Sequence, residues 1–149
     1  MSDAVSVRCT PAGPARIQVR IENRSERTVH VLAGERMPYL IAGEDGLLVL
    51  FGVNPPDPDV DYYGVEIPTT RPLEGGAAIE HEVALRPLYL RDHYEAEREP
   101  SPLTGTVTVR CEVGWGDTPI EAGERHLFSI DSVLAWQRLA ASEPVQVEL

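Results

Sequence analysis

The chain has 149 residues, of which 42% are hydrophobic, 25% charged and 6% aromatic, a balance that excludes disordered and fibrous proteins and predicts one globular domain over residues 1–149. Its 13 basic and 24 acidic residues give a formal net charge of −11, which disfavours nucleic acid and anionic membrane surfaces as partners. All the basic residues are arginine, so chemistry that needs a lysine amine is excluded.

Period-two alternation of apolar and polar residues predicts the first strands. Within residues 16–22, Ile17, Val19 and Ile21 alternate with polar side chains, the pattern of a strand with one buried and one wet face. A polar turn at residues 23–26 separates it from a second such pattern over residues 27–32. We therefore expect these two strands to form an antiparallel hairpin.

A second hairpin is predicted around residues 43–46. The pair Asp45-Gly46 is typical of a tight hairpin turn, because such turns need positive φ angles. The arm after the turn, residues 47–53, is apolar on both faces. It is expected to be a central strand, covered on both sides or placed at a sheet corner.

The remaining chain alternates short strands with loops. Prolines and aspartates make residues 54–64 a connection, since proline cannot donate to a strand ladder. Strand patterns return over four segments: 78–85, 106–115, 126–130 and 145–149. A short helix is predicted near residues 132–141, with Asp131 or Ser132 as its cap. These elements predict an all-β fold, an immunoglobulin-like antiparallel β-sandwich of about seven to nine strands.

Two cysteines end similar alternating stretches, residues 5–9 and residues 107–111. In each stretch the sulfur shares a face with valines, so Cys9 and Cys111 are expected to be buried. A sandwich could join them in a disulfide. The chain starts without the basic and apolar regions of a secretory signal, however, which predicts the reducing cytoplasm and free, buried thiols. The arginine-rich, lysine-free composition suggests a bacterial source.

The loop around residues 54–66 is the preferred binding surface. Its candidate contact residues are Asp57, Asp59, Asp61, Tyr62 and Tyr63. The aspartates alternate like the first ligands of a calcium loop, but Tyr62 stands where such a loop needs glycine, and Glu66 comes too early for the last ligand. An acidic loop with rigid aromatic side chains instead favours contact with a protein or peptide.

Trp115 is a further candidate binding residue, at the end of a strand where it either caps the core or stands exposed. The chain has four histidines: His30, His81, His93 and His126. They show no short ligand spacing, so we expect no metal and no other cofactor. His81 shares its parity with Ile79 and Val83, and a lone inward histidine is more often part of the core than a ligand.

Several turn features of residues 16–85 follow one layout: a strand, a polar turn at Asn23, a strand ending at Gly34, then Tyr39, Asp45-Gly46 and the segment 73–76. This layout resembles the immunoglobulin-like domain of bacterial intracellular proteinase inhibitors. The resemblance implies a sandwich fold and binding to an intracellular protease. It identifies no inhibitory residue.

No nucleophile elbow or nucleotide-binding glycine pattern is present. The sequence therefore favours a non-enzymatic protein- or peptide-binding accessory module of a bacterial cytoplasmic pathway, with a basic partner steered by the negative charge. Exposed edge strands offer peptide capture or homodimer formation by strand addition. Two alternatives stay open: a small metal-dependent enzyme with His and Asp ligands, and an intracellular protease inhibitor. The partner, strand order and oligomeric state cannot be predicted.

Overall fold

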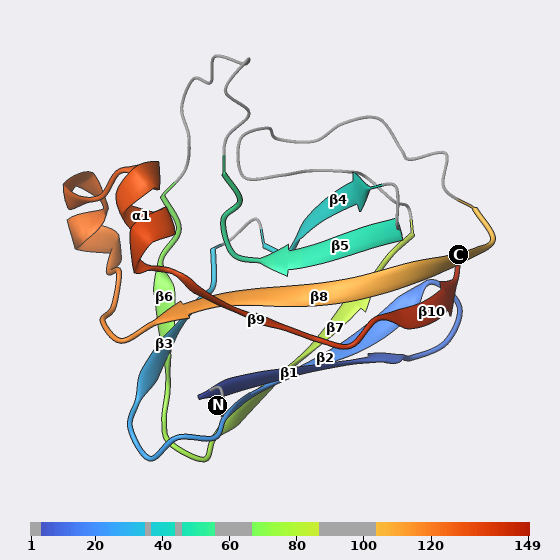
Figure 1. Ribbon diagram of the computed structural model, residues 1–149, viewed down its shortest axis with the longest axis horizontal. Helices are drawn as coiled ribbons and strands as arrows, with labels where there is room; N and C mark the ends of the chain where they lie inside the picture. The colour runs from blue at the N-terminus through green and yellow to red at the C-terminus, as the bar shows by residue number, and fades with distance from the viewer. Residues whose placement is uncertain (1–3, 35–36, 44–45, 56–66, 87–103) are drawn as a thin grey trace.

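The computed structural model describes residues 4–34, 37–43, 46–55, 67–86 and 104–149, and they form an all-β sandwich, as expected (Figure 1). The smaller sheet has the strand order β1 (Val5–Pro11), β2 (Arg16–Asn23), β7 (Ala78–Ala84). The larger sheet has the order β4 (Tyr39–Gly43), β5 (Gly46–Phe51), β8 (Thr106–Gly116), β3 (Val29–Leu32), β6 (Thr70–Leu73), and β9 (Arg138–Ala141) and β10 (Val145–Glu148) also pair with β8.

Strand β8 organises the larger sheet. It pairs in parallel with β5 on one side and antiparallel with β9 and β10 on the other. The predicted hairpin around Asp45-Gly46 is confirmed, with β4 and β5 in antiparallel register from Tyr39 opposite Leu50 to Gly43 opposite Gly46. The parallel pairing of β5 with β8 departs from a purely antiparallel sandwich, and joins segments about 60 residues apart in the chain, a distance at which alternation carries no information.

The hairpin expected between residues 16–22 and residues 27–32 is wrong. Strand β2 pairs with β1 and β7, whereas β3 pairs with β6 and β8 in the other sheet. The turn between β2 and β3 crosses from one sheet to the other. The fully buried Asn23 holds this turn against the end of β6, where the chain crosses back to β7. Its Nδ2 donates to the carbonyls of Arg27 and Leu73, and its Oδ1 accepts from the amide and hydroxyl of Ser25.

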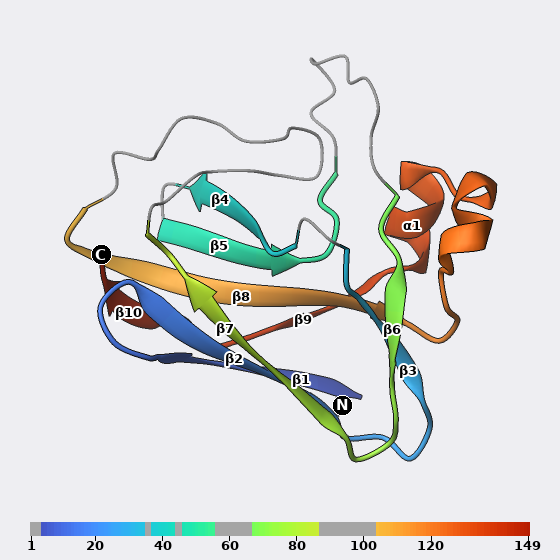
Figure 2. The same ribbon diagram turned by 180° about the vertical axis from the view of Figure 1, so that it is seen from behind.

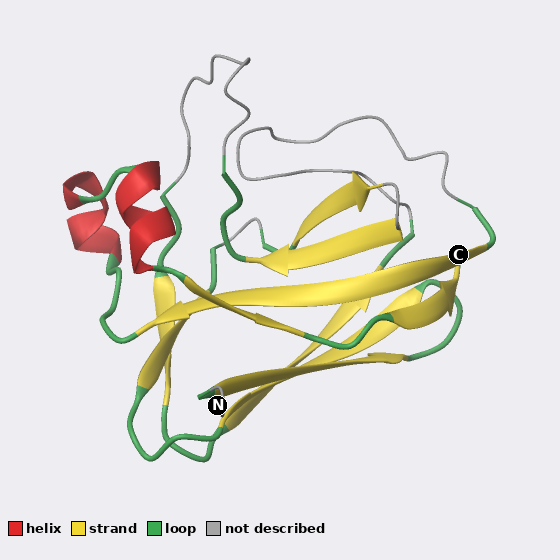
Figure 3. Ribbon diagram, in the orientation of Figure 1, coloured by secondary structure: helices red, strands yellow, loops and turns green. Residues whose placement is uncertain are grey.

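Strand β6 was not predicted, and its Pro72 explains both that omission and its place at a sheet edge, where a missing N–H is tolerated. The strand expected over residues 126–130 is also wrong. Residues Ala122–Leu127 form a 3-10 helix instead, and α1 (Ile130–Trp136) follows it at one end of the larger sheet (Figure 3). Ser129 and Ser132 cap α1 reciprocally, which places the helix start before the predicted caps.

The predicted helix over residues 132–141 ends at Trp136. Gln137 then binds the backbone of Val53 through its side chain, accepting from the N–H at 2.9 Å and donating to the carbonyl at 2.9 Å. This clamp turns the chain along β8, where residues 138–141 become β9. No helix in the described part of the chain is both long and apolar enough to cross a membrane.

The core between the sheets is mostly aliphatic, with Phe51 and Trp115 as its aromatic members, and it contains both cysteines, which are buried and free. Their thiols share a hydrogen bond across the sheets. That bond, together with burial, raises the pKa of the Cys111 thiol, and the same bond lowers the pKa of the Cys9 thiol. A second cluster of Leu32, Val53, Ile120 and Val133 fastens α1 to the larger sheet.

Candidate functional site

The binding residues predicted in the acidic loop, Asp57, Asp59, Asp61, Tyr62 and Tyr63, lie outside the described residues. Trp115 is described, and it lies inside the molecule at 5% exposure. The guanidinium of Arg138 covers its ring, 5.3 Å from the ring centroid. Its indole therefore closes the core and is not presented at the surface.

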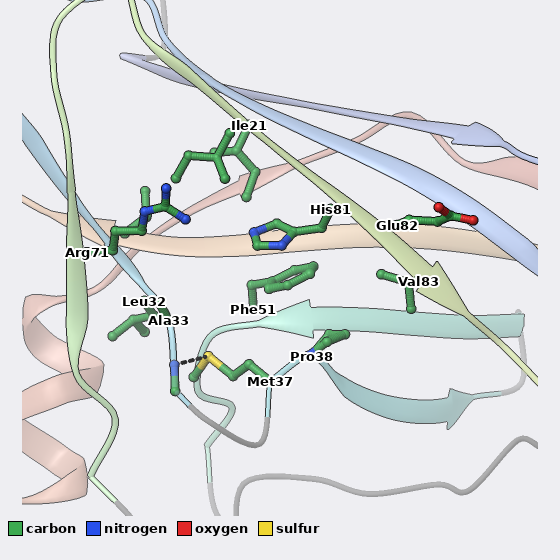
Figure 4. A pocket seen from close by; sticks show the side chains of 13 residues that line it. Ile21, Leu32, Ala33, Met37, Pro38, Phe51, Arg71, His81, Glu82 and Val83 are labelled. Atoms are coloured by element: carbon green, nitrogen blue, oxygen red, sulfur yellow. Dashed lines mark hydrogen bonds between the residues drawn. The ribbon is translucent and has the colours of Figure 1, made fainter.

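A pocket of about 300 Å³ opens between the two sheets beside β7 (Figure 4). Inward side chains of β2 and β7 form one wall, and residues of β3, the β3–β4 connection, β5 and β6 form the other. Residues that line the pocket include Ala33, Met37, Phe51, Arg71, His81 and Val83. The volume is near the lower end for small-molecule sites and suits one or two side chains of a peptide.

Phe51 and His81 form the centre of the pocket. Their rings stack with centroids 4.9 Å apart and an interplanar angle of 24°, although the two residues belong to different sheets. The expected inward orientation of His81 is confirmed. Burial, with the positive charge of Arg71, lowers the pKa of His81, so its imidazole is neutral at pH 7. A neutral imidazole offers one N–H donor and one nitrogen acceptor.

The lowered pKa of His81 makes stability depend on pH. The unfolded chain takes up a proton near pH 6.5, whereas the folded chain resists it until lower pH, so stability is full above that value and falls with pH below it. Titratable side chains in the pocket wall are Arg71, from β6, and Glu82, from β7. Urea unfolding between pH 7.5 and 5 is expected to show a steeper loss for the wild type than for His81→Gln. Parallel profiles would contradict it.

The rim opposite β7 is built by the end of β3 and the chain leading to β4. There the sulfur of Met37 accepts from the N–H of Gly34 at 3.3 Å, and Met37 is followed by a cis peptide bond to Pro38. Met37 packs against both apolar clusters, and its flexible thioether fits irregular apolar surroundings. The exposed methyl of Ala33 lies beside this rim.

Strand β7 leaves one edge without a partner among the described strands. The hydrogen bonds at its two ends, Asn23 N–H to Ala77 O and Leu85 N–H to Ala15 O, set the phase of the β2–β7 ladder. Odd-numbered residues therefore bond to β2, and the N–H and C=O groups of Glu80 and Glu82 face the free edge. Meanwhile His81 and its odd-numbered neighbours point into the pocket. The free edge of β7 can be followed in Figure 2, and side chains of the same strand line the pocket, so the edge and the pocket are side by side.

The histidines do not converge in the described residues. His30 lies on β3, His81 on β7 and His126 in the 3-10 helix, while His93 is outside the described residues. No group of three or more His, Cys, Asp or Glu side chains within the described ranges could hold a metal ion.

Of the polar pocket residues, sequence reasoning found the inward orientation of His81 but not the position of Arg71. Phe51 was expected to be buried, but its stacking on His81 depends on how the two sheets face each other. Arg71 gave no signal because its strand was not recognised. Comparison with protein-family models, with curated proteins and with solved structures finds no match to this chain.

Proposed function

We propose that this chain is a non-enzymatic protein- or peptide-binding module that holds an extended segment of a partner along the free edge of β7. The observation that carries the proposal is the position of this edge directly beside an open pocket with both apolar and polar lining residues. Main-chain hydrogen bonds to a sheet edge supply affinity in strand addition, and pockets for alternate side chains supply specificity. Both parts are present here in the correct relation.

An added strand would bond to the backbone of Glu80 and Glu82. Its alternate side chains would then point into the pocket, above the Phe51–His81 stack. Its other side chains would lie on the outer face, next to the carboxylates of Glu80 and Glu82. Those carboxylates pair with Arg20 and Arg16 but remain about half exposed, at 54% for each side chain. Basic side chains in the partner would complement them.

The same charges disfavour a second copy of the chain as the occupant. An antiparallel β7–β7 pair between two copies would set Glu80 of one copy opposite Glu82 of the other, and like charges directly opposite each other destabilise a strand pair. The partner is therefore a different chain, with basic residues on its outward face.

The test selects ligands from a phage library of random dodecapeptides, displayed with free C-termini, on the immobilised full chain. The enriched peptides are then titrated by fluorescence polarisation. Glu80→Pro removes an N–H at the free edge and no bond to β2, so it is expected to weaken binding at least about tenfold. Glu80→Ala, which also loses the carboxylate but keeps the N–H, is the matched control and is expected to bind within about threefold of the wild type. Ala33→Trp should block the pocket from an exposed position.

Two results would contradict the proposal: no peptide enriched on the wild-type chain, or enriched peptides that bind Glu80→Pro and Ala33→Trp as they bind the wild type. If the enriched peptides bind only by separating a dimer of the chain, the occupant of the β7 edge would be a second copy of the chain instead of a different partner. Urea unfolding of each variant checks that the fold is retained.

A further inference from the structure

Arg71 is a cation at one end of the pocket. Figure 4 shows its guanidinium directed toward the imidazole of His81, while the carboxylate of Glu82 lies at the other end. Glu82 is engaged by Arg16 at 2.8 Å. Across the residues that the structure describes, no carboxylate forms an ion pair with the exposed Arg71, and the same holds for Arg8, Arg86, Arg110 and Arg125. Arg71 differs from these four in lining the pocket.

His81 adds a second feature to this end of the pocket. Its ring faces the guanidinium without a hydrogen-bond partner among the described residues, so a neutral N–H is available beside a positive charge. The remaining walls near it, Ile21, Val31 and Ile79, are apolar. A group that fits this end is therefore an anion attached to an apolar body, because a guanidinium fork pairs well with a carboxylate.

The path of the chain around the pocket limits how a peptide could continue. The turn at residues 74–77 joins β6 to β7, and the two strands diverge from it (Figure 2). Arg71 lies on β6, close to this turn in the chain and near Ile21 in the pocket wall. A segment that lies on the β7 edge and runs toward Ile79 meets β6 there, which favours a segment that ends at this point.

We infer that the pocket binds the C-terminal residue of the partner peptide, with its apolar side chain against Phe51 and its terminal carboxylate on Arg71 and His81. The inference rests on the proposed function, since it requires the peptide on the β7 edge. It also sets the direction of the peptide, which runs antiparallel to β7 and places its end near Ile79.

The test uses three pools of hexapeptides, retained on the immobilised full chain and quantified by mass spectrometry. The first pool has five random positions and a C-terminal leucine with a free carboxylate, and the second is its C-terminal amide. The third has four random positions followed by Leu-Glu amide, so that the carboxylate is on a side chain. The wild type is expected to retain the first pool about tenfold better than the other two, as for loss of one charged hydrogen-bonded contact.

Arg71→Gln is expected to remove the preference for the free carboxylate. Arg27→Gln changes the net charge equally at an exposed arginine outside the pocket, and is expected to keep the preference. Glu80→Pro is expected to lose all three pools.

The outcomes separate the two proposals. Equal retention of acid and amide pools by the wild type, with both lost in Glu80→Pro, overturns the terminal carboxylate and leaves peptide binding on the β7 edge. Equal retention of the first and third pools overturns the terminal origin in favour of a side-chain carboxylate. Retention of no pool by the wild type, together with no enriched dodecapeptide, overturns both proposals.

Discussion

Replacing Asn23 with alanine is expected to lower the free energy of unfolding by about 3 kcal/mol, because the carbonyl of Leu73 would lose the Asn23 donor in a buried position and the carbonyl of Arg27 would keep only the hydroxyl of Ser25. The side chain is completely buried and makes four hydrogen bonds, at 2.7 to 3.0 Å, so water cannot replace it without opening the core. These bonds tie the β2–β3 crossing to the end of β6. Urea unfolding at pH 7 measures the effect.

Two controls define this result. Ser25→Ala removes hydrogen bonds at the more exposed side of the same turn and is expected to cost about 1 kcal/mol or less. Arg24→Ala removes an exposed side chain paired with Glu22 and is expected to change stability by less than about 0.5 kcal/mol. An Asn23→Ala protein as stable as Arg24→Ala would show that the buried network does not hold the two sheets together.

The second large effect is expected at Gly46. This residue has a φ of +132°, and a Cβ atom added to it would overlap the backbone carbonyl of Thr108 in β8. Gly46→Ala therefore combines backbone strain with a clash against a central strand, and a loss of about 3 kcal/mol or more is expected in urea unfolding.

Gly13→Ala separates these two causes. Gly13 has a φ of +106°, but an added Cβ would meet nothing within 4 Å, so this variant reports backbone strain without a clash. It is expected to lose only about 1 kcal/mol. Equal losses in the two variants would show that Gly46 is needed for its φ angle alone and that β5 and β8 can separate at no measurable cost.

Local patterns predicted much of the fold. Alternation gave β2, β7, β8 and β10 close to their observed bounds, and Asp45-Gly46 gave the β4–β5 hairpin, because both signals arise within a few residues. Features set by contacts distant in the chain were not predicted. In the sequence Asn23 has the features of an ordinary turn residue, and its structural role depends on its hydrogen bond to the distant carbonyl of Leu73. Likewise, α1 ends before Gln137 because the side chain of Gln137 binds the distant backbone of Val53.

The candidate site follows the same division. His81 alternates with Ile79 and Val83 on the same face of its strand, and this pattern predicted that its side chain points inward. The stacking on Phe51, the approach of Arg71 and the free edge of β7 depend on strand order, which the sequence alone does not specify. The acidic loop chosen from its aspartates and tyrosines stays a prediction.

Amide hydrogen exchange of the full chain, with and without an enriched peptide, tests peptide binding at the β7 edge most directly. The amides of Glu80 and Glu82 face the free edge and have no strand partner among the described residues, whereas those of His81 and Val83 already bond to β2. We expect bound peptide to slow exchange at Glu80 and Glu82 by at least about tenfold, with a smaller change at His81 and Val83. Unchanged exchange at Glu80 and Glu82 under saturating peptide would contradict the account.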